Sequence, residues 1–302
     1  MTDNAHDMVK ASLAADSLAL GVHWIYNAEK IKSDHGRVDR LLAPPPDSYH
    51  PNRKKGEFTH YGDQTLALLA SVARVGRFDP ELFYRDWQAL FEGYDGYMDT
   101  ATKTTLRNIA AGKGPEACGS ASNDLAGAGR ISPLVMVLRH DPDVLDRAAR
   151  DQTRMTHQDA DTVDAAAFFA RLCQACLDNT RPSVAAKQIA ETVFPDTPVE
   201  MWTLQGLSAA DRDSLDAVKR FGQSCHTNEA FSGVVQIIAK YENDPGTGIV
   251  EAVMAGGDNA ARAGVVAMVL AAYNGMDAAM ETWFDELVQK DRILELLDRI
   301  PR

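Results

Sequence analysis

Hydrophobic residues recur along most of the chain at the three- and four-residue spacing of helices. Leu66, Leu69 and Val72 follow this spacing within residues 64–76, for example. An α-helix has 3.6 residues per turn, so such side chains lie on one face. No alternation of period two is sustained, and β-branched residues do not cluster as they do in strands. The pattern therefore predicts an all-α protein.

The periodic stretches predict thirteen helices, separated by short connections. We expect them at residues 5–20, 64–76, 80–93, 98–111, 131–139, 143–154, 158–177, 183–193, 208–221, 228–241, 248–256, 259–274 and 276–299. The last of these is long enough to be interrupted. Residues 33–58, which contain three consecutive prolines, are predicted to be a loop, and residues 178–207 a connection with one short helix. No change in composition marks a boundary, so we expect one domain over residues 1–302.

Two aspartates next to glycines stand where predicted helices begin. Asp63 follows Gly62 at the start of the helix over 64–76, and Asp258 follows Gly257 at the start of the helix over 259–274. The free N–H groups and the positive dipole end of a helix suit an anion or a metal-bound oxygen cluster. Asp is also a preferred N-cap residue. Each aspartate is thus a candidate site residue or a helix cap.

A third stretch, residues 118–130, is rich in glycine and other small residues. Such a loop lets the backbone approach a ligand closely, and its N–H groups can cradle phosphates. Its position just before a predicted helix suits a pyrophosphate. The candidate ligand-binding residues in this stretch are Gly119, Ser120, Ser122, Asn123, Gly127 and Arg130.

Several other polar residues have two interpretations. His157, Asp159 and Asp161 have side chains suited to metal binding or acid–base chemistry, although a helix cap explains the two aspartates equally well. Asp16 lies inside an apolar helix and therefore needs a partner. His23, Trp24 and Tyr26 could line a pocket or form a core cluster. The basic residues at 53–55 could clamp a phosphate or lie in a solvated loop.

Composition excludes some classes of partner. The chain has 302 residues, 45% hydrophobic and 25% charged, and a net charge of −12, which argues against nucleic acid or an anionic membrane surface as partner. No apolar run of 18 residues could span a membrane, and residues 1–7 are polar, unlike a signal peptide. Four cysteines suit a reducing compartment, so we expect a cytoplasmic protein. Cys173 and Cys176 share a helix face without a second pair, which favours core packing over zinc.

The order of these motifs resembles that of a known family. An Ala-Asp-Ser-Leu helix around Asp16 precedes Gly62-Asp63-Gln64-Thr65, then Gly119-Ser120-Ala121-Ser122-Asn123 with Arg130, then Thr156-His157, then Gly256-Gly257-Asp258. In this order they resemble the ADP-ribosylglycohydrolase family, over about residues 8–275 of the chain. The pieces His23-Trp24-Ile25-Tyr26 and Tyr61-Gly62-Asp63-Gln64 are similar to a divergent branch near the jellyfish crystallins and a fish selenoprotein.

The resemblance implies an all-α orthogonal helical bundle with a two-magnesium centre in a cleft that binds ADP-ribose, free or linked to protein. It implies that Asp63 and Asp258 are metal ligands and catalytic groups, with Gln64 as a third ligand. It also implies that His157 and the loop from Gly119 to Arg130 contact the substrate.

The sequence departs from the family pattern at ligand positions. Gly62 and Gln64 stand where the family has Thr and Asp, and Ala260 and Ala261 replace later ligand positions. Two Mg²⁺ ions normally need several carboxylates, and Asp63 and Asp258 are only two. We therefore expect one weakly held Mg²⁺ or none.

Two functions follow from this resemblance. The first is a hydrolase that cleaves an N- or O-glycosidic bond of an ADP-ribose-type substrate, in which a metal polarises the ribose hydroxyls and Asp63 serves as base or ligand. The alternative is a non-catalytic member that binds a nucleotide or has a structural role, because a shared fold does not carry function.

Overall fold

The structure is a computed structural model that describes residues 4–300. Residues 1–3, which belong to the polar N-terminal segment, and residues 301–302 lie outside this range. The described residues form helices and no strand, so the all-α prediction is confirmed. The helices are α1 (Asn4–Leu20), α2 (Ala28–His35), α3 (His60–Val75), α4 (Pro80–Leu90), α5 (Thr100–Ala110), α6 (Ala126–Gly129), α7 (Ser132–Leu138), α8 (Pro142–Arg154), α9 (Ala160–Leu177), α10 (Pro182–Val193), α11 (Pro198–Ser208), α12 (Ser214–Phe221), α13 (Thr227–Lys240), α14 (Pro245–Met254), α15 (Asn259–Asn274), α16 (Ala278–Asp285) and α17 (Lys290–Asp298).

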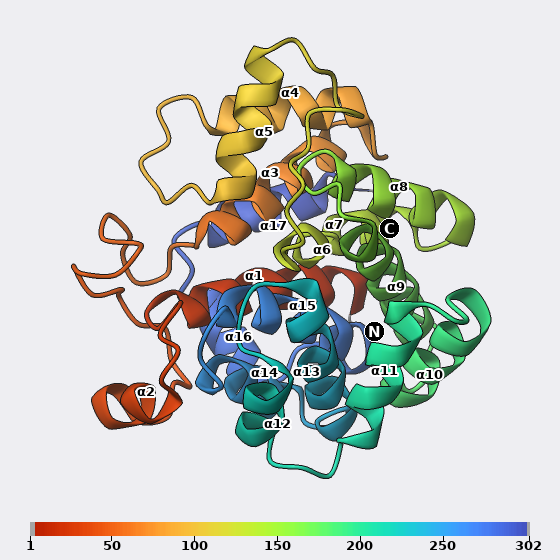
Figure 1. Cartoon of the computed structure of the whole chain (residues 1–302). Coiled ribbons are helices and arrows are strands. Elements are labelled where there is room, and N and C mark those ends of the chain that lie inside the picture. The colour runs from red at the N-terminus through yellow and green to blue at the C-terminus, as the bar shows by residue number, and fades with distance from the viewer. Residues whose placement is uncertain (1–3, 301–302) are drawn as a thin grey trace.

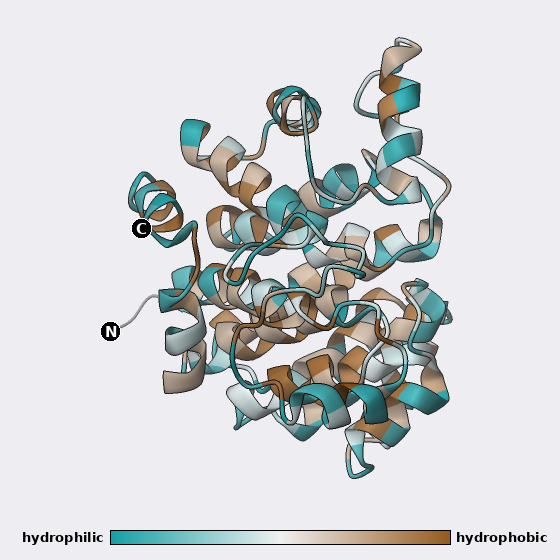
Figure 2. Cartoon of the chain, turned by 90° about the vertical axis from the view of Figure 1, so that its left-hand side faces the viewer, coloured by the Kyte–Doolittle hydropathy of each residue, from teal (hydrophilic) through white to brown (hydrophobic). Residues whose placement is uncertain are grey.

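Helices α1 and α15 form the centre of the bundle (Figure 1), where they pack along one another. Every residue of α15 from Asn259 to Ala272 is buried, and most of them are Ala or Val. A helix that is apolar on all sides belongs in a core, and small side chains let a neighbouring helix approach closely. Hydrophobic residues gather where the helices face one another, and hydrophilic residues lie on outer turns (Figure 2).

The other helices surround this central pair. In Figure 1, α3, α4 and α5 lie above it, and α12 and α14 lie below it.

Cys173 and Cys176 of α9 are buried, which confirms that they belong to the core. Among residues 4–300, no helix has the length and apolar character needed to cross a membrane.

Three helices were absent from the sequence-based prediction: α2, the short α6 and α11. Helix α11 begins at Pro198, after the N-cap Thr197, whose side chain accepts a hydrogen bond from the N–H of Glu200. Proline fits the first turn of a helix, so here it marks a start and not a break. Consequently the helix expected at 208–221 begins only at Ser214. Helix α2 lies partly within the predicted loop at 33–58. The helix predicted at 276–299 is interrupted, as expected, between α16 and α17.

Candidate functional site

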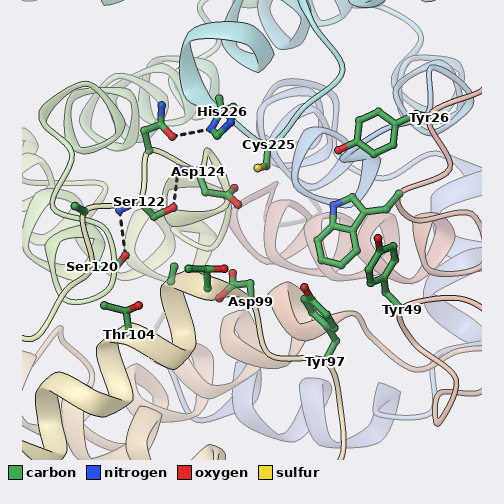
Figure 3. Close-up of a pocket in the computed structure, with 15 residues that line it drawn as sticks. Tyr26, Tyr49, Tyr97, Asp99, Thr104, Ser120, Ser122, Asp124, Cys225 and His226 are labelled. Carbon is green, nitrogen blue, oxygen red and sulfur yellow. Dashed lines mark hydrogen bonds between the residues drawn. The ribbon is translucent and has the colours of Figure 1, made fainter.

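A cavity of about 650 Å³ opens among loops that come from distant parts of the sequence. Figure 3 shows acidic, aromatic and small polar side chains around it. Its lining residues are Trp24, Tyr26, Tyr49, Tyr97, Asp99, Thr100, Ala101, Thr104, Ser120, Ala121, Ser122, Asn123, Asp124, Cys225 and His226. Small-molecule sites in proteins have volumes of roughly 300–1,000 Å³.

Two glycines allow the loops behind the cavity to cross at close range. Gly256 and Gly257 have φ angles of 69° and 67°, and a Cβ at Gly257 would lie only 2.1 Å from the backbone oxygen of Gln223. The backbone of Gly257 accepts a hydrogen bond from the N–H of Trp24 at 3.0 Å. The N–H of Asp258 donates to the oxygen of Gln223 at 2.9 Å. Glycine is required here because a side chain would separate these segments.

Short backbone contacts hold the small-residue loop against the segment before α13. The N–H of Leu125 donates to the oxygen of Cys225, and the N–H of Thr227 donates to the oxygen of Asn123, both at 2.8 Å. Asp124 and His226 form an isolated β-bridge between these bonds. Asp124 is thereby fixed beside Cys225 at the wall of the cavity.

Asp124, Cys225 and Asp258 converge at this wall. One oxygen or sulfur atom of each lies within 4.8 Å of the others. Asp258 is 2% exposed and lies behind the lining residues. Its Oδ1 lies 2.9 Å from His23 Nε2, and its Oδ2 accepts the Tyr61 hydroxyl at 3.2 Å. His23 Nδ1 in turn lies 2.8 Å from His50 Nε2.

The two acidic side chains that line the cavity have opposite pKa shifts. Burial, followed by the charges of Asp258 and Asp99, raises the pKa of Asp124 well above its usual value. Burial also acts to raise the pKa of Asp99, but its interactions with His60 and with the N–H of Thr102 outweigh burial and lower this pKa. The surroundings therefore favour the protonated form of Asp124 and the ionised form of Asp99.

Asp63 lies in a different place from Asp258, so the two predicted ligands do not meet. Its Oδ2 accepts Arg53 Nη2 at 2.7 Å and the Tyr94 hydroxyl at 2.6 Å, and all three residues line a separate cavity of about 370 Å³. Neither aspartate caps its helix through the side chain. Thr59 caps α3, and Asp258 occupies the N-cap position of α15 without a side-chain hydrogen bond to the helix.

Gln64, Arg130 and His157 belong to a buried polar network. Gln64 Oε1 accepts Trp87 Nε1 at 2.7 Å and Arg130 Nη1 at 2.8 Å. Arg130 Nη2 donates to the Thr156 hydroxyl, which also lies 2.8 Å from His157 Nδ1. These groups bind one another, and none of the three predicted site residues lines the larger cavity.

The predicted glycines also lie outside that cavity. A Cβ at Gly127 would come within 2.8 Å of the His157 ring, and one at Gly119 within 2.1 Å of the Arg154 backbone oxygen. Both glycines are therefore explained by close packing. Of the predicted loop residues, Ser120, Ser122 and Asn123 do line the cavity, and Asn123 Oδ1 lies 2.7 Å from His226 Nδ1.

The side chains at the family's ligand positions do not fit a two-magnesium centre. Asp63 is held by Arg53 and Tyr94, the Gln64 oxygen already accepts two hydrogen bonds, and Ala260 and Ala261 offer no ligand atom. Asp124, Cys225 and Asp258 remain as the one group of this kind among residues 4–300. Magnesium prefers six oxygen ligands in near-octahedral geometry, and a thiol suits softer ions.

Six acidic, aromatic, cysteine or histidine residues of the cavity lining were not among the predicted site residues: Tyr49, Tyr97, Asp99, Asp124, Cys225 and His226. Asp99 is a helix cap by pattern, and it does cap α5 by accepting the N–H of Thr102 at 2.6 Å. The side chain of Asp99 also lies at the cavity wall. The other loops of that wall come from distant parts of the chain, so the local sequence does not reveal this role. The polar run from Gln223 to Thr227, just before a helix, was the one local sign of a site near Cys225.

Comparisons with known proteins bear on this geometry. The protein-family model for ADP-ribosylglycohydrolase matches residues 1–302. The chain is 23% identical over 324 aligned residues to crystallin J1A of Tripedalia cystophora, covering 100% of this chain and 98% of that protein. It is 23% identical over 309 residues to an uncharacterized protein of Archaeoglobus fulgidus, covering 99% and 96%.

A solved structure described as an ADP-ribosylglycohydrolase-related protein complex has a similar fold. It superposes with a TM-score of 0.71 at 20% sequence identity, covering 98% of this chain and 96% of that chain. Identity at this level shows the fold alone, whereas the family model extends over the full length of the sequence. The protein belongs to the ADP-ribosylglycohydrolase family.

Proposed function

We propose that the 650 Å³ cavity binds an ADP-ribose-type substrate and hydrolyses its N- or O-glycosidic bond, with Asp124 as general acid and Asp99 as general base. The observation that carries this proposal is that the carboxyl groups of Asp99 and Asp124 line the same cavity, and the opposite directions of their pKa shifts support it. Paired carboxyl groups whose surroundings push their pKa values apart are the usual acid and base of glycoside hydrolysis. Figure 3 shows both side chains at the cavity, on different loops.

In the proposed reaction, Asp124 donates its proton to the leaving oxygen or nitrogen as the bond to the anomeric carbon breaks. Asp99 orients a water molecule and takes its proton as the new bond from water oxygen to that carbon forms. Positive charge develops on the sugar in this transition state. The ionised Asp99 and the buried carboxylate of Asp258 stabilise that charge.

Asp258 acts as a positioning residue in this scheme because it lies behind the lining. Its charge is one cause of the raised Asp124 pKa, which keeps the acid protonated. Burial lowers the pKa of His23, so its ring is neutral and holds Asp258 through a hydrogen bond. The residues Ser120, Ser122 and Asn123 would contact the sugar and phosphate end of the substrate.

A turnover assay tests the proposal. Release of ADP-ribose from N- and O-linked derivatives would be measured with and without Mg²⁺ for the wild type, Asp124→Asn and Asp99→Asn. Loss of a general acid or base should lower kcat by on the order of 10²–10⁴-fold. Asp95→Asn, at a carboxylate whose side chain is 70% exposed, serves as the control. Undiminished turnover in both cavity variants, with melting temperatures unchanged, would refute the assignment.

A non-catalytic binding role is the second candidate. It is favoured by the loss of ligand side chains at Gly62, Gln64, Ala260 and Ala261. In that case ADP-ribose would still raise the melting temperature, because it binds only the native state, but no derivative would be cleaved.

A further inference from the structure

The lining of the large cavity combines aromatic rings with acidic groups. Four of its side chains are Trp24, Tyr26, Tyr49 and Tyr97, and two are the carboxyl groups of Asp99 and Asp124. Neither Lys nor Arg is among the lining residues that the structure describes. A site built for an anion alone normally presents such cations.

Three of the rings stand nearly perpendicular to one another. Trp24 makes interplanar angles of 84° with Tyr49 and 75° with Tyr97, and these two tyrosines make an angle of 83°. The ring centroids are 4.8–5.6 Å apart. The three rings, which we call the aromatic corner, therefore present surfaces in three directions at one end of the cavity. His23 stacks on the Trp24 ring with centroids 4.2 Å apart and holds it in place.

Negative charge lies next to the aromatic corner. Asp99 is two residues from Tyr97 and is close enough that its charge contributes, after burial, to the raised pKa of the Tyr97 hydroxyl. The Tyr97 ring also attracts a cation of the chain itself, because Lys103 Nζ lies 5.5 Å from its centroid. Aromatic faces beside a carboxylate are the arrangement by which proteins bind organic cations such as alkylated ammonium groups.

We propose that the aromatic corner binds an alkylated ammonium group, carried by the leaving group of the glycoside that the cavity hydrolyses. This proposal rests on the proposed function and adds that the leaving group carries a positive charge. The phosphate-bearing end of such a substrate would lie toward the backbone of residues 120–123 and His226, on the other side of Asp99 and Asp124. An ammonium group packed against the rings keeps its charge near Asp99 and loses little by leaving water.

Two probes of equal shape test this inference. Choline has a quaternary ammonium group, and 3,3-dimethyl-1-butanol replaces its nitrogen by carbon and so has no charge. Binding of each would be measured by calorimetry and by Trp fluorescence. We expect choline to bind at least about tenfold more tightly, as a partly desolvated cation–π contact provides. Equal affinities, or no binding of choline, would overturn the proposal.

Variants of the aromatic corner complete the test. Tyr97→Leu should abolish the preference for choline, whereas Tyr97→Phe should keep it because the ring remains. Tyr49→Leu provides a second variant at a residue that is 55% exposed, where folding is not at risk. A preference for choline that survives both leucine variants would contradict the proposal.

The same assays separate this inference from the proposed function. Turnover of ADP-ribosyl derivatives without a preference for choline would leave the hydrolase standing and refute the cation site. A choline preference that depends on Tyr97, without turnover of any glycoside, would support the cation site and refute the hydrolase.

Discussion

Gly62 lies directly against the carboxylate of Asp16, so that a Cβ at Gly62 would come within 2.5 Å of Asp16 Oδ2. This carboxylate accepts the N–H of Thr59 at 2.8 Å, the Thr59 hydroxyl at 2.6 Å and the N–H of Gly62 at 3.1 Å. The sequence suggested that the start of α3 binds an anion or a metal-bound oxygen cluster. It binds the carboxylate of Asp16, an anion of the chain itself. The buried charge of Asp16 has the partner that its position required.

Replacing Gly62 by Ala should destabilise the fold by about 1–3 kcal/mol, as overpacking of a dense interior does. The added methyl group must displace either the Asp16 carboxylate or the start of α3. Gly114→Ala is the matched control, because a Cβ there would meet nothing within 4 Å. Urea unfolding of both variants measures the difference. Equal stability of the two variants would show that the Asp16 contact is not tight.

The pH dependence of stability should reveal Asp16. Burial, only partly offset by Thr59, raises its pKa to about 6 in the folded protein, against 3.8 as the ordinary value. The folded state therefore binds the proton more tightly, and stability falls as pH rises from about 4 to about 6. At about 1.4 kcal/mol per pKa unit, the loss is roughly 3 kcal/mol.

Asp16→Asn cannot titrate at this position and isolates the effect. Its stability relative to the wild type should improve by roughly 3 kcal/mol between pH 4 and pH 7, by the same linkage. Urea unfolding at the two pH values gives this difference. A constant difference between the two proteins would mean that the Asp16 pKa is not raised.

Sequence periodicity was sufficient for most of the helices because burial on one face is a local property. The helix predicted at 259–274 coincides with α15, where nearly every residue is buried. The predicted start of α3, at residue 64, is four residues late. The helix begins at His60, directly after its N-cap Thr59, and its first residues are a polar stretch without hydrophobic periodicity. Helix α11 was absent from the prediction because residues 178–207 were expected to be a connection with one short helix, whereas Pro198 is a first-turn residue of α11.

The site was harder to predict because its geometry depends on contacts between distant loops. Asp124 and Cys225 are neighbours only because backbone hydrogen bonds join the two loops that carry them. The position of Asp63 at the start of a helix suggested that it meets Asp258. In the structure Arg53 of the basic loop binds Asp63 at the separate 370 Å³ cavity. Helix starts can be inferred from sequence, whereas the direction in which a side chain points from them cannot.

Magnesium titration should show no pair of tight sites. The wild type should give at most one weak binding isotherm, because two carboxyl groups and a thiol do not replace the oxygen-rich ligand set of Mg²⁺. Asp258→Asn should remove any such isotherm, and Asp63→Asn should not. Calorimetry makes both comparisons. Two tight sites per chain would show that the ligand positions rearrange around the metal.

Asp63→Asn should affect stability more than ligand binding in the large cavity. An amide in place of the carboxylate leaves the largely buried Arg53 without its closest charge partner, at a cost of about 1–3 kcal/mol. Asp95→Asn is the control, since Asp95 also contacts Arg53, at 3.4 Å, but is 70% exposed and should contribute little. Thermal unfolding and ADP-ribose binding would be measured together. A loss of binding or turnover without a loss of stability would show that Asp63 belongs to the catalytic site.

Asp258→Asn tests how the cavity raises the pKa of Asp124. The Asp258 charge is, after burial, the largest cause that raises the Asp124 pKa. Without that charge Asp124 should lose its proton at lower pH, so the alkaline limb of the kcat/KM profile should move toward lower pH. Titration of the carboxyl carbons by ¹³C NMR should show the same direction of change without depending on turnover. A purely structural effect would instead lower the rate equally at every pH.

Tyr61→Phe is the matched control for this variant, because it removes the 3.2 Å hydrogen bond to Asp258 Oδ2 but leaves the charge of Asp258 in place. Its alkaline limb should stay much closer to that of the wild type. The charge on Asp99, which also raises the Asp124 pKa, is present in all three proteins and so cancels in the comparison. If the limb lies at the same pH in wild type and Asp258→Asn, Asp258 does not tune the acid, and its bonds to His23 and Tyr61 serve packing alone.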